Sequence, residues 1–193
     1  MSESLDIQVA ELRSLLIARV GEPKKLYSLV YDGYSVVGMD EAEEDDSPLC
    51  RILCPPVADE VVTAAEASLG FALPSLLRAV YTRIGNGGLC LRLLGLAGGQ
   101  PGGEDLFPGL SAVEIYHELE GWRRDGKIAY LPSGLLPLND DLGCGMVDYV
   151  DCRTAEGKVW RTDSGSLSER QPALFAYFRE AIEGYRSLVQ KHA

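Results

Sequence analysis

Few residues of this sequence combine into a pattern that could carry out catalysis. Nucleophilic catalysis needs a nucleophile, a nearby base and a group that orients the base. The chain has two histidines, His117 and His192, and it has no Gly-x-Ser-x-Gly segment that would present a serine nucleophile. A cysteine–histidine pair could form in space, so that alternative stays open. The sequence as a whole favours a protein that is not an enzyme.

Metal binding is the second kind of chemistry to consider. The spacings Cys50-x3-Cys54 and Cys144-x7-Cys152 differ from the paired short spacings of a structural zinc site. Asp140 and Asp141 could hold a divalent cation or act as paired carboxylates, which would suit a small metal-dependent enzyme. The glycines that follow them favour a simple turn instead. We therefore expect neither a metal nor a cofactor.

An acidic run at residues 40–46 is the most unusual stretch of the chain. Its sequence, DEAEEDD, contains six acids in seven positions. A calcium loop would need alternating oxygen ligands, a central glycine and a terminal glutamate, and this run has none of these features. Such a run is either a solvated linker or an electrostatic contact for a basic partner. The residues concerned are Asp40, Glu41, Glu43, Glu44, Asp45 and Asp46.

The charge balance of the whole chain points in the same direction. The formal net charge is −11 over 193 residues, 46% of which are hydrophobic. Such a charge disfavours binding to nucleic acids and anionic membranes, and it attracts basic proteins. It could also serve solubility alone. No apolar run reaches the roughly 20 residues that cross a bilayer, and the sequence shows no signal peptide, so we expect a cytoplasmic protein with reduced cysteines.

The stretch from Ala58 to Gly88 predicts two helices around a sharp corner. Asp59 is placed to cap the first helix, and Gly70 to end it in a left-handed conformation. Pro74 suits the first turn of the second helix. The apolar stripe of that helix comprises Leu76, Leu77, Val80, Tyr81 and Ile84. The Gly-Asn-Gly-Gly sequence at 85–88 should stop it, before a strand at residues 89–94.

Outside this stretch, periodicity predicts helices at both ends of the chain and strands between them. Helices are expected at residues 5–20, 111–124 and 172–189, the second beginning with a capping box of Ser111 and Glu114. A hairpin is expected around Asp32-Gly33, and a surface loop at residues 95–109. Strands are expected at residues 128–131, 135–138, 146–151 and 158–163. This order indicates an α+β fold with a mostly antiparallel sheet packed against helices.

A set of these residues resembles the SUKH superfamily, which includes the Smi/Knr cell-wall regulators of fungi and many bacterial immunity proteins. The first landmark consists of Glu66, Leu69, Gly70, Leu73, Pro74, Tyr81, Asn86, Gly87 and Gly88. Residues 136–138 and the acidic glycine turn at 140–145, with Gly143 and Gly145, resemble the second landmark. Residues 157–160 resemble the next strand. The resemblance covers roughly residues 55–185 and implies a core domain at 55–193. Residues 1–54 lie outside it, and the amphipathic pattern at 5–20 predicts an extension that packs on this core.

The resemblance also implies a function. Many members protect a bacterium by binding a toxin that competing cells deploy, frequently a nuclease. A non-catalytic immunity protein is therefore expected, with a basic toxin domain as its partner and with the run at 40–46 and Asp140-Asp141 as candidate contacts. A regulatory or scaffold module like the fungal members is the alternative. The turn of Asn86, Gly87 and Gly88 is assigned to the fold.

Overall fold

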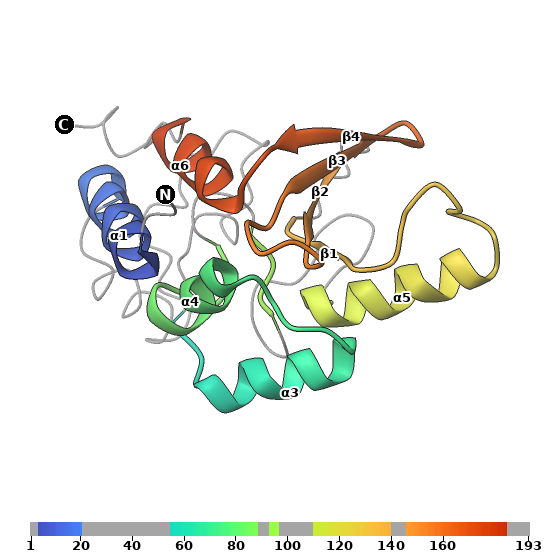
Figure 1. Ribbon diagram of the computed structural model, residues 1–193, viewed down its shortest axis with the longest axis horizontal. Helices are drawn as coiled ribbons and strands as arrows, with labels where there is room; N and C mark the ends of the chain where they lie inside the picture. The colour runs from blue at the N-terminus through green and yellow to red at the C-terminus, as the bar shows by residue number, and fades with distance from the viewer. Residues whose placement is uncertain (1–3, 21–54, 89–92, 97–109, 140–145, 185–193) are drawn as a thin grey trace, which may run out of the picture.

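The computed structural model of the protein describes residues 4–20, 55–88, 93–96, 110–139 and 146–184. Five helices and a four-stranded antiparallel sheet make up this part of the chain. Figure 1 shows the sheet on one side of the molecule, α5 and α3 below it, and α4, α6 and α1 towards the other end. The α+β fold predicted from the sequence is confirmed.

Helix α1, Leu5–Val20, packs on the body of the protein by the stripe that its sequence predicts. Val9, Leu12 and Leu16 are buried, and the helix contacts α6 and α4. An ion pair between Asp6 and Arg83, 2.8 Å long, adds a polar contact at its start. The predicted hairpin around residues 32–33 lies outside the described residues, and the division into extension and core stays a prediction.

Helices α3, Asp59–Leu69, and α4, Ser75–Arg83, form the predicted corner. Gly70 ends α3 with a φ of 79°, as expected for a left-handed C-cap. The prediction that Asp59 caps α3 is wrong: Ala58 stands at the cap position, and the Asp59 carboxylate turns to Arg78, 3.0 Å away. Pro74 lies one residue before α4 rather than in its first turn.

Helix α5, Ala112–Arg124, begins at the predicted capping box. The Glu114 backbone N–H donates to Ser111 Oγ, and the Ser111 backbone N–H donates to the Glu114 carboxylate over 2.7 Å. The Ser111 hydroxyl also donates to the Glu114 carboxylate, over 2.6 Å, and this bond, followed by that from the Ser111 backbone N–H, lowers the pKa of Glu114 by stabilising its ionised form. The amides of Ala112 and Val113 donate to Gly95 and Leu96, which fixes this helix to the segment at 93–96.

The sheet consists of β1 Leu135–Pro137, β2 Met146–Asp151, β3 Val159–Asp163 and β4 Ser166–Gln171, in that order. Each strand pairs antiparallel with the next. The prediction of a strand at residues 128–131 is wrong. Gly126, with a φ of 74°, ends α5, and a series of turns follows it. Within these turns the Leu131 N–H donates to the Ile128 carbonyl. Strand β4 is absent from the prediction because its polar sequence, SLSERQ, has no apolar alternation.

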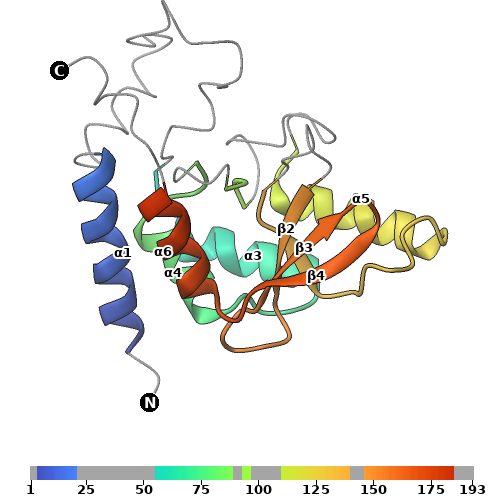
Figure 2. The same ribbon diagram turned by 90° about the horizontal axis from the view of Figure 1, so that it is seen from above.

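The two faces of the sheet are covered by different elements. Helix α6, Leu174–Gly184, packs on the face that contains Asp148, because the Tyr177 hydroxyl donates to that carboxylate over 3.0 Å. Leu174, Phe178 and Ile182 on α6 are buried. Helix α5 contacts β1, and Figure 2 shows α5 and α6 on either side of the sheet region. No described helix is long and apolar enough to cross a membrane.

Candidate protein-binding surface

The residues predicted to contact a partner lie outside the described part of the chain. They are Asp40, Glu41, Glu43, Glu44, Asp45, Asp46, Asp140 and Asp141. Gly143 and Gly145 also lie outside it. Their predicted roles therefore stay predictions. The described residues show which other carboxylates are exposed, how they are paired, and where the chain could carry out chemistry.

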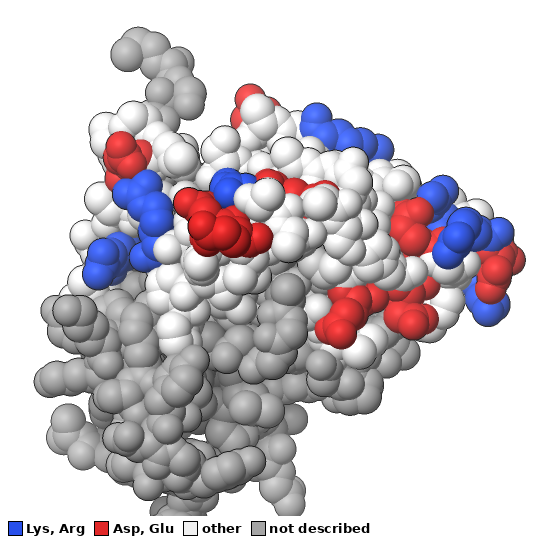
Figure 3. Space-filling model, turned by 90° about the horizontal axis from the view of Figure 1, so that it is seen from below, with Lys and Arg blue, Asp and Glu red and all other residues white. Residues whose placement is uncertain are grey.

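Most described carboxylates already have a basic partner within the chain. Examples on three elements are Glu120 with Arg123, Lys127 with Asp125, and Glu169 with Lys158. Figure 3, which views the molecule from the α3 side, shows acidic side chains with basic ones beside them over much of this face. Exposed pairs of this kind contribute only about 0–1 kcal/mol each, but they neutralise the charge that a partner would meet.

A few exposed acids have no ion-pair partner among the described residues. Glu60 on α3 and Glu118 on α5 belong to this group, and both helices pack against each other. Glu156 lies in the turn before β3, and Asp163 at the tip of the hairpin between β3 and β4. No base among the described residues neutralises the charge of these carboxylates.

The exposed surface between α3 and α5 also contains a serine–histidine contact. Ser68 Oγ lies 3.0 Å from His117 Nε2. A hydrolase would need a third group to orient the imidazole and a donor for the oxyanion. Among the described residues, no carboxylate bonds to the other ring nitrogen of His117, and both side chains lie on the exposed sides of their helices. The contact joins α3 and α5, and the described residues provide no carboxylate that would orient the imidazole.

A buried carboxylate, Asp148 on β2, is a residue that sequence reasoning missed. Its side chain is 3% exposed and accepts two hydrogen bonds from Arg161, of 2.6 and 2.8 Å. Its backbone N–H donates to Asn139 Oδ1, and Tyr177 donates to its Oδ2. Burial, followed by the nearby Asp148 charge, raises the pKa of Tyr177 well above its usual value. An acid at the centre of the apolar strand MVDYVD is the only sequence signal for this cluster.

Asp148 therefore joins four parts of the fold. The cluster links β2 and β3 to α6 and to the segment that follows β1. A buried charge of this kind persists only when its oxygens are bonded on all sides. The arrangement can stabilise and orient these elements.

The one cysteine whose side chain is described is a poor nucleophile. Burial raises the pKa of the Cys152 thiol to about 12, and the neighbouring Asp151 charge adds to the shift. A thiol with this pKa is almost entirely protonated at neutral pH, whereas catalysis requires the thiolate. Across the described residues, no group of three or more His, Cys, Asp or Glu side chains could hold a metal ion.

The comparison with known families agrees with this geometry. Residues 56–180 of the chain match the SMI1 / KNR4 family (SUKH-1). The chain belongs to this family. No curated protein shows significant similarity to it. The SUKH-1 match begins just before α3 and ends within α6, so the sequence-based estimate of residues 55–185 is close to it and α1 lies outside.

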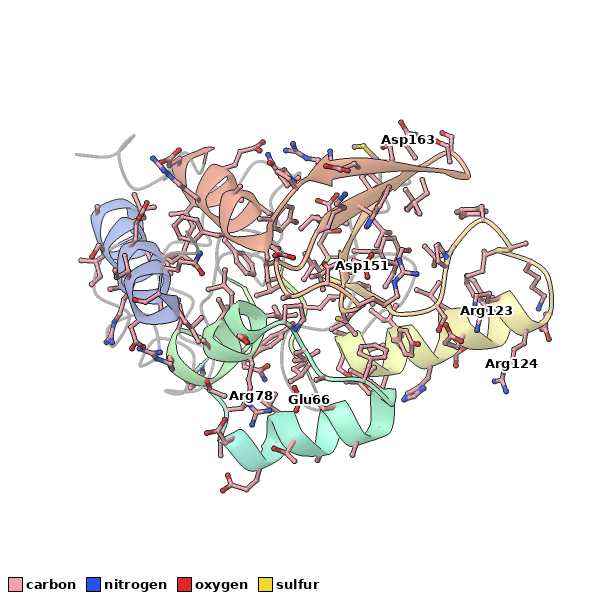
Figure 4. The ribbon with its side chains drawn as sticks, in the orientation of Figure 1. Glu66, Arg78, Arg123, Arg124, Asp151 and Asp163 are labelled. Atoms are coloured by element: carbon pink, nitrogen blue, oxygen red, sulfur yellow. The ribbon has the colours of Figure 1, made fainter. Side chains whose placement is uncertain are left out.

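The SUKH-1 landmark residues of the corner form one hydrogen-bonded unit. Glu66 Oε1 accepts from the Leu73 amide over 2.9 Å, and its Oε2 accepts from Arg78 over 2.6 Å. Arg78 reaches back to Asp59 on the first turn of α3. Figure 4 shows Glu66 and Arg78 facing each other between α3 and α4, with Asp151 beside the sheet, well away from them.

The turn after α4, which completes the first landmark, lies in the interior. Asn86 Oδ1 accepts from the Leu96 amide over 2.8 Å, and the Tyr81 hydroxyl donates to the Leu94 carbonyl over 3.1 Å. Gly87 has a φ of 106°, and a Cβ there would lie 2.9 Å from the Gly95 nitrogen. This geometry favours a role in the fold rather than in binding, and that role stays a prediction.

Proposed function

We propose that this SUKH-1 protein is a non-catalytic immunity protein, which binds and neutralises a toxin domain. The observation that carries the proposal is the family match over residues 56–180 in a chain whose net charge is −11. The family supplies the general class of protein binding. The charge supplies the chemistry of the partner, which is a basic protein.

A nuclease toxin is the partner that fits this charge best. Nucleases present basic grooves to phosphate backbones, and an acidic protein can occupy such a groove and accelerate its own association by electrostatic attraction. The proposed contacts are the acidic run at residues 40–46 and Asp140-Asp141. Glu60 on α3 and Glu118 on α5, which have no ion-pair partner among the described residues, are further candidate contacts.

A growth assay tests the proposal directly. The DNA flanking this gene is sequenced first, and a toxin-like domain encoded there is expressed with and without the present chain. We expect growth to stop without the chain and to recover with it. A chain that fails to restore growth, although it is folded and expressed, contradicts the proposal.

Charge variants in the same assay test the acidic contacts. Replacing the six acids of residues 40–46 by their amides should weaken toxin binding about tenfold or more, since several favourable charge contacts are lost. Asp125→Asn is the control, because Asp125 is an exposed acid that Lys127 already neutralises. Equal binding by both variants would remove the run at 40–46 from the interface.

A regulatory or scaffold module is the second candidate, favoured by the family's own description, SMI1 / KNR4. Such a protein binds a cellular partner without blocking an activity. A stoichiometric complex that leaves the activity of the partner unchanged would support this candidate over the immunity role.

A further inference from the structure

Strand β4 forms one edge of the four-stranded sheet. At the other end of the sheet, Leu94 N–H donates over 2.8 Å to Leu138, the residue that follows β1, and α5 contacts β1. β4 is paired on one side only, with β3. In Figure 2, no described element runs along the outer side of β4.

The hairpin geometry identifies the backbone groups that face outward. Ser164 and Gly165, with φ values of 48° and 84°, form the two-residue turn between β3 and β4. In such hairpins the flanking residues, here Asp163 and Ser166, exchange both hydrogen bonds, and bonded and non-bonded pairs then alternate. Leu167 and Glu169 are therefore in non-bonded pairs, opposite Thr162 and Trp160, and direct their N–H and C=O groups away from β3.

The side chains next to this edge are suited to a protein contact. Trp160 and Leu167 are both half-buried, and the strand register places them on the same face of the sheet. Lys158 lies over the Trp160 ring at 5.6 Å and pairs with Glu169 at 2.9 Å. Helix α6 packs on the opposite face, where Tyr177 meets Asp148. Partly exposed tryptophans beside polar side chains are frequent anchors of protein interfaces.

We propose that the outer edge of β4 receives an extended strand of the protein partner, whose alternate side chains lie against Trp160 and Leu167. Backbone hydrogen bonds to an exposed sheet edge are a recurrent mode of protein recognition. This inference rests on the proposed function and names the surface through which the toxin domain is bound.

The net charge of the chain favours a strand from a basic partner at this edge over β4 from a second copy of the chain. Two copies that each carry a net charge of −11 repel each other, whereas a basic protein is attracted. The edge also carries protection against self-pairing, because β4 contains Glu169 and Arg170 and its pairing with β3 is irregular at Val159 and Trp160. Charges and bulges of this kind prevent edge-to-edge association of identical chains.

A pair of variants at one position tests the inference. Glu169→Pro removes the outward N–H and places a ring against the incoming strand, whereas Glu169→Ala removes only the carboxylate. Both variants lose the Lys158 ion pair, so they differ in the backbone alone. Binding to the purified toxin domain encoded beside the gene should stay within about threefold of wild type for Glu169→Ala and fall about tenfold or more for Glu169→Pro.

Hydrogen exchange in the wild-type protein provides a second measurement that does not depend on the folding of the proline variant. The Leu167 and Glu169 amides should exchange more slowly once the toxin domain is bound. Unchanged exchange at both amides, or equal binding by folded Glu169→Pro and Glu169→Ala variants, would overturn the inference while leaving the immunity role in place. A wild-type protein that does not bind the toxin domain overturns the proposed function, and the edge inference with it.

Discussion

The carboxylate of Glu66 lies 2.6 Å from the guanidinium of Arg78 and holds α3 against α4 at the corner between them. Its second oxygen accepts the Leu73 amide, which lies outside both helices and needs an acceptor. The Glu66 side chain is 18% exposed, so its bonds are partly shielded from water. One acid therefore satisfies a loop amide and anchors a base from the next helix.

Replacement of Glu66 should destabilise the fold in proportion to the bonds that are lost. We expect Glu66→Ala to lower the free energy of unfolding by about 2–3 kcal/mol, and Glu66→Gln, which keeps an acceptor for Leu73, by about 1 kcal/mol. Asp59→Asn is the control, since Asp59 pairs with the same Arg78 but is 72% exposed. It should cost under about 0.5 kcal/mol. Urea denaturation measures all three, and equal losses at Glu66 and Asp59 would contradict this account.

Gly87 should tolerate no side chain. A Cβ at this position would lie 2.9 Å from the Gly95 nitrogen, and the φ of 106° is unfavourable for other residues. Gly87→Ala should therefore lower the free energy of unfolding by about 3 kcal/mol or more.

Gly121, within α5, is the matched control for Gly87, because nothing lies within 4 Å of a Cβ placed there. Gly121→Ala should stabilise the protein by up to about 1 kcal/mol, since alanine favours helices. Thermal unfolding distinguishes the two variants. A Gly87→Val protein that folds normally and yet loses its partner would show that the turn acts in binding instead.

The buried Asp148 cluster should make a larger contribution to stability than any exposed acid. Asp148→Ala leaves Arg161 and Tyr177 without their shared acceptor and should cost about 3–5 kcal/mol. Tyr177→Phe removes one hydrogen bond and should cost about 1–2 kcal/mol. Asp163→Asn, at the exposed hairpin tip, should change stability little. Denaturation midpoints rank the variants, and an Asp148→Ala loss no greater than that of Asp163→Asn would refute the role of the cluster.

Asp151 should make the stability of the protein sensitive to acid. Its hydrogen bonds to Arg153, of 2.8 Å each to the guanidinium, hold the pKa of the Asp151 carboxyl below its usual range. The folded state therefore binds the proton less readily than the unfolded state does. The resulting stabilisation is present above the unfolded pKa, about 3.9, and is lost as the pH falls through the lower folded value.

An Asp151→Asn variant isolates this contribution. It should be less stable than wild type at pH 7 and should lose less stability between pH 5 and pH 2, since the shifted group is gone. Urea titrations at a series of pH values measure the difference. Parallel curves for the variant and wild type would mean that Asp151 has no part in the acid response.

Much of the fold could be predicted from the sequence because local rules determine those elements. The stripe of Val9, Leu12 and Leu16, the left-handed Gly70 and the capping box at Ser111 each require only neighbouring residues. Strand β4 could not be predicted, because an exposed edge strand needs no apolar alternation. At residues 128–131 a strand was predicted where none forms, because these apolar residues lie in turns that begin at Gly126.

The site is less predictable than the fold for a physical reason. Asp148 and Tyr177 come into contact only when β2 and α6 pack together. Asp59 accepts a hydrogen bond from Arg78, nineteen residues away, instead of one from the amides of its own helix. Partners that meet through tertiary packing leave little trace in local spacing. The position of β4 at the edge likewise depends on the order of the strands in the sheet, and no short sequence motif predicts that order.

The most direct test of the proposed immunity role is a titration of the purified toxin domain, encoded beside the gene, with this chain. We expect a stoichiometric complex that abolishes the activity of the toxin, with an affinity that falls as salt screens the acidic surface. No complex at low salt would contradict the immunity role. A complex that leaves the toxin fully active would contradict it as well.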